Sequence, residues 1–185
     1  MEAEPFILFG TDHLLAILTV ILISTLVPHY LKKTSLATKK RFGSVLAYIL
    51  ILNELVKPYY HTQFFGYDLL NVLPFHMCAL SAFSISFFLL TNKRIFYEVA
   101  FFWGIGGGLM ALLQPDTPLD FPDPVFIIFY LSHGGMLLAI GHASIALENR
   151  PNLDSVKRAI VVSLVVILVI YFINLYLDHL LISGT

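Results

Sequence analysis

Six long apolar segments, separated by short polar ones, follow one another along the 185 residues of the chain. They cover about 13–30, 43–60, 70–90, 95–113, 124–147 and 156–177, with ends defined to within about two to four residues. Each is long enough to cross a bilayer as a helix, which takes roughly 20 residues. Apolar positions do not alternate with a period of two, so a β-barrel is not indicated. The pattern predicts an all-α polytopic transmembrane helical bundle of six spans, forming a single domain over residues 1–185.

Composition agrees with a membrane protein. The chain is 58% hydrophobic and 12% charged, whereas a soluble domain carries about 25% charged residues. The N-terminus "MEAEPF" is acidic and lacks the basic region of a signal peptide, so we expect the first segment to remain as an anchor. The net charge of -1 gives no indication of nucleic-acid binding.

Basic residues alternate between the connections. Ten of the eleven Lys and Arg residues lie in the first, third and fifth connections or beside them, and the second and fourth have none. The positive-inside rule makes the basic connections cytoplasmic. We therefore predict a multi-pass protein of the cell membrane with both termini extracytoplasmic. The eleventh basic residue, Lys57, lies inside a span.

An ionisable residue inside a span costs about 2.5–3.5 kcal/mol to insert on translocon scales. Most such residues of this chain fall in the predicted outer halves of the spans. A rise of 1.5 Å per residue puts His76 and Cys78 roughly 9–12 Å below the outer boundary and His133 roughly 13 Å below it. We predict that His76 faces a polar cavity that it shares with residues of other spans, namely Glu54, Lys57, Gln114 and His133. The cavity or substrate-binding residues are Asp12, His13, Asn53, Glu54, Lys57, Gln114 and Asp116, and the catalytic candidates are His76, Cys78 and His133.

Each of these residues also has a structural interpretation. Glu54 and Lys57 share a helix face and can neutralise each other. A lone histidine in a span is commonly a hydrogen-bonded core residue, and Cys78 is commonly a small buried side chain. In "LPFHMC", Pro74 is expected in the first helical turn, where its missing N–H costs least.

Glycines indicate close helix packing. Gly104 and Gly108 form a G-x-x-x-G pair in the fourth segment, and Gly134 and Gly135 follow His133 in the fifth. Such small residues allow helix backbones to approach, so we expect the fourth and fifth spans to be neighbours.

Four motifs carry a family resemblance: "FGTDHLL" at 9–15, "LPFHMC" at 73–78, "FWGIGGGLMALLQPD" at 102–116 and "SHGGMLL" at 132–138. In this order they resemble the YwaF family of integral membrane proteins. That family is similar to a vertebrate transmembrane acyltransferase of ether-phospholipid metabolism and, more distantly, to six-span lipid hydrolases with a threonine nucleophile and a histidine. The resemblance also implies a further segment, a seventh span, after "LYLDHLLISGT".

The resemblance implies that His133 is the histidine of the catalytic pair and that the nucleophile lies in "LPFHMC". The vertebrate cysteine stands just before the motif histidine, where this chain has Phe75, and Cys78 comes two residues after His76. A water activated by the histidines is therefore the alternative nucleophile to Cys78. Gln114 or Lys57 would stabilise the oxyanion.

Two functions stay open. The first is an intramembrane acyltransferase or lipid-ester hydrolase, and the second is a non-catalytic transporter or binding protein for lipids or small molecules. A zinc or non-haem iron site formed by His76, His133 and Glu54 is a third alternative. No cofactor is indicated; the expected partners are membrane lipids, and a homo-oligomer is left open.

Overall fold

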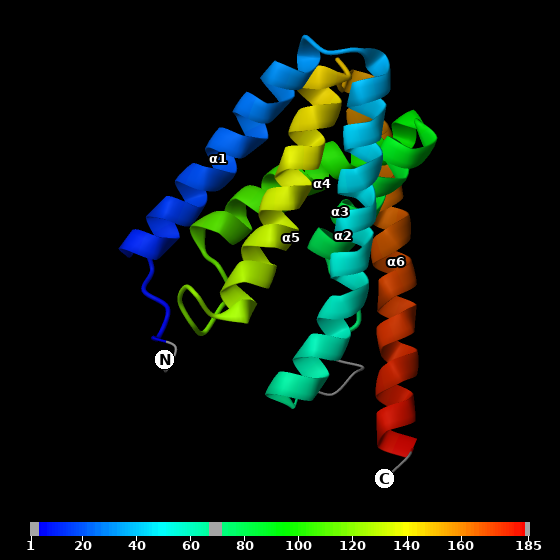
Figure 1. The fold of residues 1–185 in the computed structure, drawn as a ribbon. Coiled ribbons are helices and arrows are strands. Elements are labelled where there is room, and N and C mark those ends of the chain that lie inside the picture. Colours follow the sequence, from blue (N-terminus) through cyan, green and yellow to red (C-terminus); the bar gives the residue numbers. More distant parts are fainter. Residues whose placement is uncertain (1–3, 67–71, 184–185) are drawn as a thin grey trace.

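The computed structural model describes residues 4–66 and 72–183, without the side chains of residues 64–65 and 178–183. The described residues form six α-helices, one π-helical turn and an isolated bridge between Pro5 and Leu119. This confirms the predicted all-α class (Figure 1). The elements are α1 (Thr11–Lys32), α2 (Leu36–Phe65), α3 (Met77–Thr91), α4 (Arg94–Leu113), α5 (Pro124–Gly141), η2 (His142–Ala146) and α6 (Leu153–Ser183).

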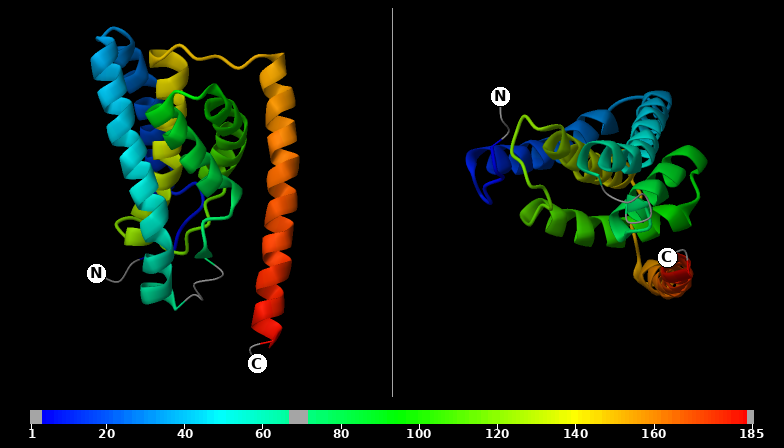
Figure 2. Two further views of the ribbon diagram at one scale, coloured as in Figure 1. Left: turned by 90° about the vertical axis from the view of Figure 1, so that its right-hand side faces the viewer. Right: turned by 90° about the horizontal axis from the view of Figure 1, so that it is seen from below.

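Helix α5 is the centre of the bundle and packs against α1, α2, α3 and α4. The buried core between these helices includes Leu50, Ile85, Tyr97, Met136 and Ile140. Helix α6 lies outside this group, beside α4, and Figure 2 shows it standing apart from the other helices over much of its length. The bundle is therefore a five-helix body with a sixth helix attached to one side.

Four of the described helices are long and apolar enough to span a membrane: α1, α4, α5 with its π-helical turn, and α6. Helix α2 has 30 residues but carries Glu54 and Lys57. Helix α3 has only 15 residues, or about 22 Å, against a hydrocarbon core of about 30 Å. The structure thus shows a multi-pass membrane protein, with fewer unambiguous spans than the six predicted.

The third predicted segment differs most from the structure. Its first residues, 70 and 71, lie outside the described residues, and α3 begins only at Met77. The expectation that Pro74 sits in the first helical turn is wrong. The proline disfavours helical geometry at Leu73, and His76 caps the helix from outside.

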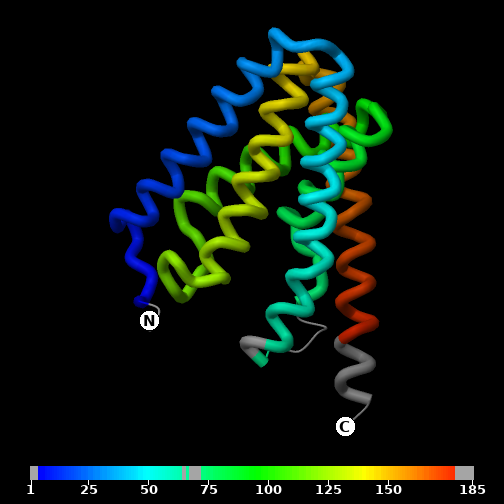
Figure 3. Tube along the Cα trace, viewed as in Figure 1, coloured from blue at the N-terminus to red at the C-terminus, as the bar shows by residue number. Residues whose placement is uncertain are grey.

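The connections gather at two ends, as the charge pattern predicts. The basic end comprises the connections 33–35, 92–93 and 147–152, and the acidic end comprises the N-terminal segment and the connection 114–123 (Figure 3). At the basic end Lys32 forms a 2.9 Å ion pair with Glu148, and this cation lowers the pKa of that carboxyl. Which end faces the cytoplasm stays a prediction.

Glycines allow the close approaches around α5. Gly108 faces Met136 and Leu137, so α4 and α5 are neighbours as predicted. A Cβ atom on Gly134 would lie 2.7 Å from Val20 Cγ2 of α1. Gly135 faces Leu50 of α2. The two adjacent glycines therefore serve two different helices.

Candidate functional site

A polar pocket of about 560 Å³ opens at the acidic end of the bundle. Its walls come from α2, the segment before α3, the connection 114–123 and the first turn of α5. Among the lining residues are Glu54, Lys57, His61, Val72, Leu73, Pro74, His76, Asp116, Pro118 and Val125. Four of the predicted site residues, Glu54, Lys57, His76 and Asp116, therefore share one cavity.

A buried charge cluster links this pocket to α5. The Lys57 ammonium donates to both carboxylate oxygens of Glu54 at 3.1 Å and to the Ser132 hydroxyl at 3.0 Å. The same hydroxyl donates to Glu54 Oε1. Glu54 is 1% exposed, and the Lys57 side chain is 15% exposed. The predicted intrahelical pair is confirmed, and Ser132 extends it to a second helix.

His76 has a defined tautomer because it caps α3. Its Nδ1 accepts a hydrogen bond from the Ala79 backbone N–H at 3.2 Å. A neutral imidazole with an accepting Nδ1 carries its proton on Nε2. His76 therefore presents an N–H donor rather than a lone pair. This also accounts for the histidine in "LPFHMC": it is the N-cap residue that precedes the first turn of α3.

His133 has the opposite tautomer. It lies on α5 directly after Ser132, is 7% exposed and contacts Phe129, with ring centroids 4.3 Å apart and the rings tilted by 34°. Its Nδ1 donates to the Phe129 carbonyl at 3.0 Å, which leaves the lone pair of a neutral ring on Nε2. Of the two catalytic histidine candidates, His133 is the one able to accept a proton.

Cys78 lies in the first turn of α3 and faces α4. A Cβ atom built on Gly107 would lie 3.7 Å from its sulfur. The side chain is half-buried, and it is not among the described residues that line the polar pocket. His133 does not line the pocket either; its neighbour Ser132 makes the link. The catalytic roles of these residues stay predictions.

The other predicted residues lie elsewhere. His13 is fully buried: its Nδ1 accepts from the Phe9 N–H and its Nε2 donates to the Leu112 carbonyl, so it joins the N-terminal segment to α4. Asp12 lines an apolar groove formed by α1, α2 and α5. Gln114 is exposed at the end of α4, and Asn53 is half-buried. The structure thus separates these four from the pocket.

The described residues contain no group of three or more His, Cys, Asp or Glu side chains placed to hold a metal ion. The alternative of a zinc or iron site at His76, His133 and Glu54 therefore has no support from the described residues. Glu54 instead satisfies its carboxylate with Lys57 and Ser132.

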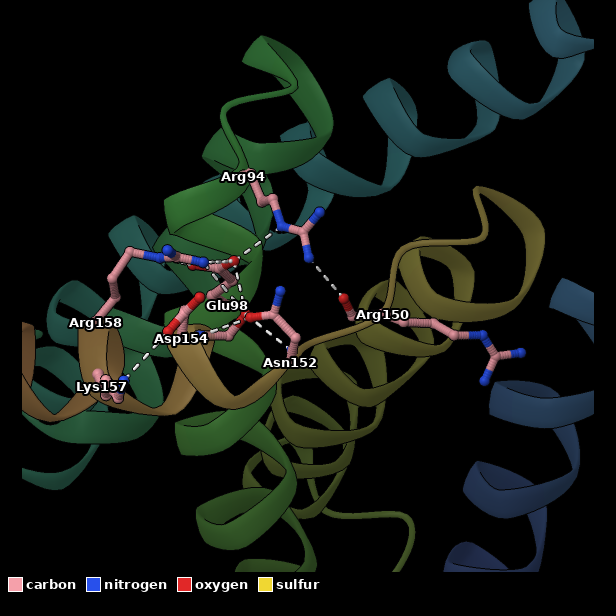
Figure 4. Close-up of polar contacts among 8 residues, drawn as sticks. Arg94, Glu98, Arg150, Asn152, Asp154, Lys157 and Arg158 are labelled. Atoms are coloured by element: carbon pink, nitrogen blue, oxygen red, sulfur yellow. Dashed lines mark hydrogen bonds and ion pairs between the residues drawn. The ribbon is translucent and has the colours of Figure 1, made fainter.

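A second buried carboxylate, Glu98, lies at the basic end, where its hydrogen bonds join two helices (Figure 4). It accepts two hydrogen bonds from Arg158, at 2.7 and 2.6 Å, and one each from Arg94 and Ser155. Arg158 and Ser155 belong to α6, and Arg94 also donates to the Arg150 carbonyl. This cluster joins the start of α6 to α4.

Ser132 is the site residue that sequence reasoning missed. Serines in spanning helices commonly bond to a carbonyl of their own helix, so the residue type alone carries little information. In the structure Gly135, three residues later on the same face, packs against α2, and Ser132 meets Glu54 and Lys57 of that helix.

The comparisons with known proteins agree with this architecture. An uncharacterized protein of Treponema pallidum (strain Nichols) is 33% identical over 63 residues, which is 34% of this chain. That match spans about a quarter, 26%, of the relative's own length. No solved structure matches the chain. The YwaF name inferred from the motifs is not shown by these matches. The model of the TMEM164 family covers residues 8–180, and the chain therefore belongs to the TMEM164 family.

Proposed function

We propose that this protein is an intramembrane enzyme that transfers or hydrolyses an acyl group of a membrane lipid at the polar pocket. One observation carries the proposal: the pocket collects His76, Lys57 and Glu54, and Ser132 joins it to the helix that holds His133. Acyl transfer needs a base, a nucleophile and donors for the oxyanion. The pocket and the residues beside it offer a group for each role.

The hydrogen-bond pattern supports the following roles. His133 Nε2 takes the proton of the nucleophile, which is a water or the Cys78 thiol. The nucleophile attacks the ester carbonyl carbon, and the oxyanion that forms accepts hydrogen bonds from His76 Nε2–H and the Lys57 ammonium. The C–O bond then breaks, and the leaving alkoxide takes the proton back from His133. With water the product is a free acid; with Cys78 an acyl-enzyme passes the group to a second alcohol.

Replacing His133 tests the proposal. In purified protein supplied with phospholipid and a lysophospholipid acceptor, His133→Ala should lower turnover by about 10²–10⁴-fold, the usual contribution of a general base. His133→Gln, which keeps a donor for the Phe129 carbonyl, should be equally inactive if the base matters. His29→Ala removes an exposed histidine of α1 and is the matched control. Unchanged turnover in folded His133→Ala protein overturns the proposal.

A second function, binding or transport of lipid without chemistry, is favoured by the saturation of the charge cluster. Glu54, Lys57 and Ser132 satisfy one another and leave no free nucleophile among them. Lipid that co-purifies with the protein and is recovered unchanged after long incubation would support this function. Released fatty acid or transferred acyl chains would exclude it.

We also propose that all six helices contribute to a bundle whose acidic end is extracytoplasmic. The distribution of Lys and Arg supports this orientation. A membrane-impermeant thiol reagent applied to intact cells should label Phe121→Cys above the level of the unchanged chain, and should not label Leu153→Cys. Both side chains are exposed, at opposite ends. The reverse labelling would invert the topology.

A further inference from the structure

A long apolar groove lies between α1, α2 and α5 and, among the described residues, shares no lining residue with the polar pocket. Helices α1 and α2 meet at the basic end and diverge toward the acidic end, with α5 between and behind them (Figure 1). The groove between them has a volume of about 670 Å³. Its α1 wall runs from Asp12 to Ser24 and its α5 floor from Phe126 to Leu138. At 1.5 Å per residue each wall is about 18 Å long.

The lining has one charged end and an apolar length. Asp12, near the acidic end, is the only charged side chain among the described residues that line the groove. The remainder is aliphatic or aromatic apart from Thr19, Ser24 and Tyr130. Tyr130 is 9% exposed, and in the described part of the chain its hydroxyl has no hydrogen-bond partner. The groove wall therefore retains an unused donor within an apolar surface.

We propose that this groove binds one acyl chain of a membrane phospholipid, lengthwise, with the polar part of the lipid at the acidic end. Its length and apolar lining fit an extended hydrocarbon chain, and its one charge lies at the mouth. An acyl chain that moves from the bilayer into the groove exchanges one apolar environment for another, so the hydrophobic effect does not favour binding. Binding therefore depends on close packing between the chain and the groove. The groove supplies that packing because α1, α2 and α5 contact the chain from three sides.

The groove and the polar pocket meet at shared elements. The connection 114–123 gives Asp116 and Pro118 to the pocket and Phe121 to the groove. The first turn of α5 gives Val125 to the pocket and Phe126 to the groove. A lipid whose chain lies in the groove would have its glycerol and ester region at the acidic end, where these shared elements lie. In this respect the inference deepens the proposed function and rests on it, since the substrate would be a phospholipid held by its chain.

Photolabelling tests the groove directly. The protein is reconstituted in phosphatidylcholine vesicles that contain a phosphatidylcholine with a diazirine on its acyl chain, irradiated, and mapped for adducts. Ile23→Trp fills the groove from α1, and Leu22→Trp is its control: both side chains are 44% exposed, but only Ile23 lines the groove. On α2, Ile49→Trp fills the groove, and Leu52→Trp is the corresponding control outside it.

Adducts should concentrate on the groove residues of α1, α2 and α5, and each groove-filling variant should lose them several-fold while its control does not. Having fillers on two helices keeps the test valid if one variant fails to fold, as judged by circular dichroism. Equal labelling of groove and control positions would show ordinary lipid contact and overturn the proposal.

The same experiment separates this inference from the proposed function. His133→Ala should keep the adduct pattern, because His133 does not line the groove. If wild-type protein shows concentrated adducts but no turnover, the acyl-chain groove is supported and the proposed enzymatic function is overturned. If wild-type protein shows turnover but no concentrated adducts, the enzymatic function is supported and the acyl-chain groove is overturned.

Discussion

The Lys57→Met variant tests whether the charge cluster of α2 and α5 holds those helices together. The substitution removes three hydrogen bonds, two to Glu54 at 3.1 Å and one to Ser132 at 3.0 Å. It leaves the Glu54 carboxylate, 1% exposed, with only the Ser132 hydroxyl as a donor. Breaking one side of a buried ion pair costs about 3–5 kcal/mol. We expect the free energy of unfolding to fall by that amount.

The double variant Glu54→Gln/Lys57→Met separates the charge from the packing. It removes both charges and keeps an amide that can accept from Ser132. Because replacing a whole buried pair is often nearly neutral, the double variant should recover most of the loss, with a coupling energy of about 2–3 kcal/mol. The assay is reversible unfolding in mixed micelles followed by circular dichroism. Lys32→Met, which breaks an exposed pair of similar length, is the control and should change little. A loss under about 1 kcal/mol in Lys57→Met, or additive effects in the double variant, would refute the reasoning.

Two further predictions concern packing and the attachment of α6. Gly134→Ala should lower the free energy of unfolding by about 1–3 kcal/mol, because its Cβ meets the branched Val20 at 2.7 Å. The control Gly106→Ala, whose Cβ would have no atom within 4 Å, should be neutral or stabilising. Equal losses in the two variants would contradict this account. Glu98→Gln should speed amide hydrogen exchange at the start of α6 several-fold, since it weakens the hydrogen bonds to Arg158 and Ser155. The control Lys157→Gln, which breaks an exposed ion pair, should leave that exchange unchanged. Unaltered exchange in Glu98→Gln would mean that apolar packing alone holds α6.

The sequence predicts the helices well because apolar run length and loop charge act locally. The grouping of connections at two ends and the contact of α4 with α5 both follow from local patterns. The prediction for the third segment is wrong at its start because the apolar run includes "LPFH", whereas the helical backbone begins only after it. Pro74 and the N-cap His76 delay the start of the helix to Met77, after the apolar run has begun. Hydropathy measures solvent preference and is insensitive to where a helix starts.

The candidate site is only partly predictable for a related reason. Depth along a span follows from counting residues, and Glu54, Lys57 and His76, which it groups, line one pocket, whereas Gln114 and His133 do not. Rotation about the helix axis does not follow from depth, and it sends His13 and Asp12 to other surfaces of the bundle. Ser132 was missed because its role depends on a partner helix that the sequence does not name.

The two buried carboxylates show why an ionisable residue in a span is not enough to locate function. Glu98 receives four hydrogen bonds from three side chains, two of them at the start of α6, and its surroundings are fully used in joining helices. Glu54 is equally buried, but its partner Lys57 and the carboxylate itself line a cavity of about 560 Å³. The cavity leaves room for a ligand beside the charge of Glu54. Buried charge marks a place where desolvation has been offset, and it is the adjoining empty volume, next to an apolar groove, that makes the acidic end the place to look for chemistry.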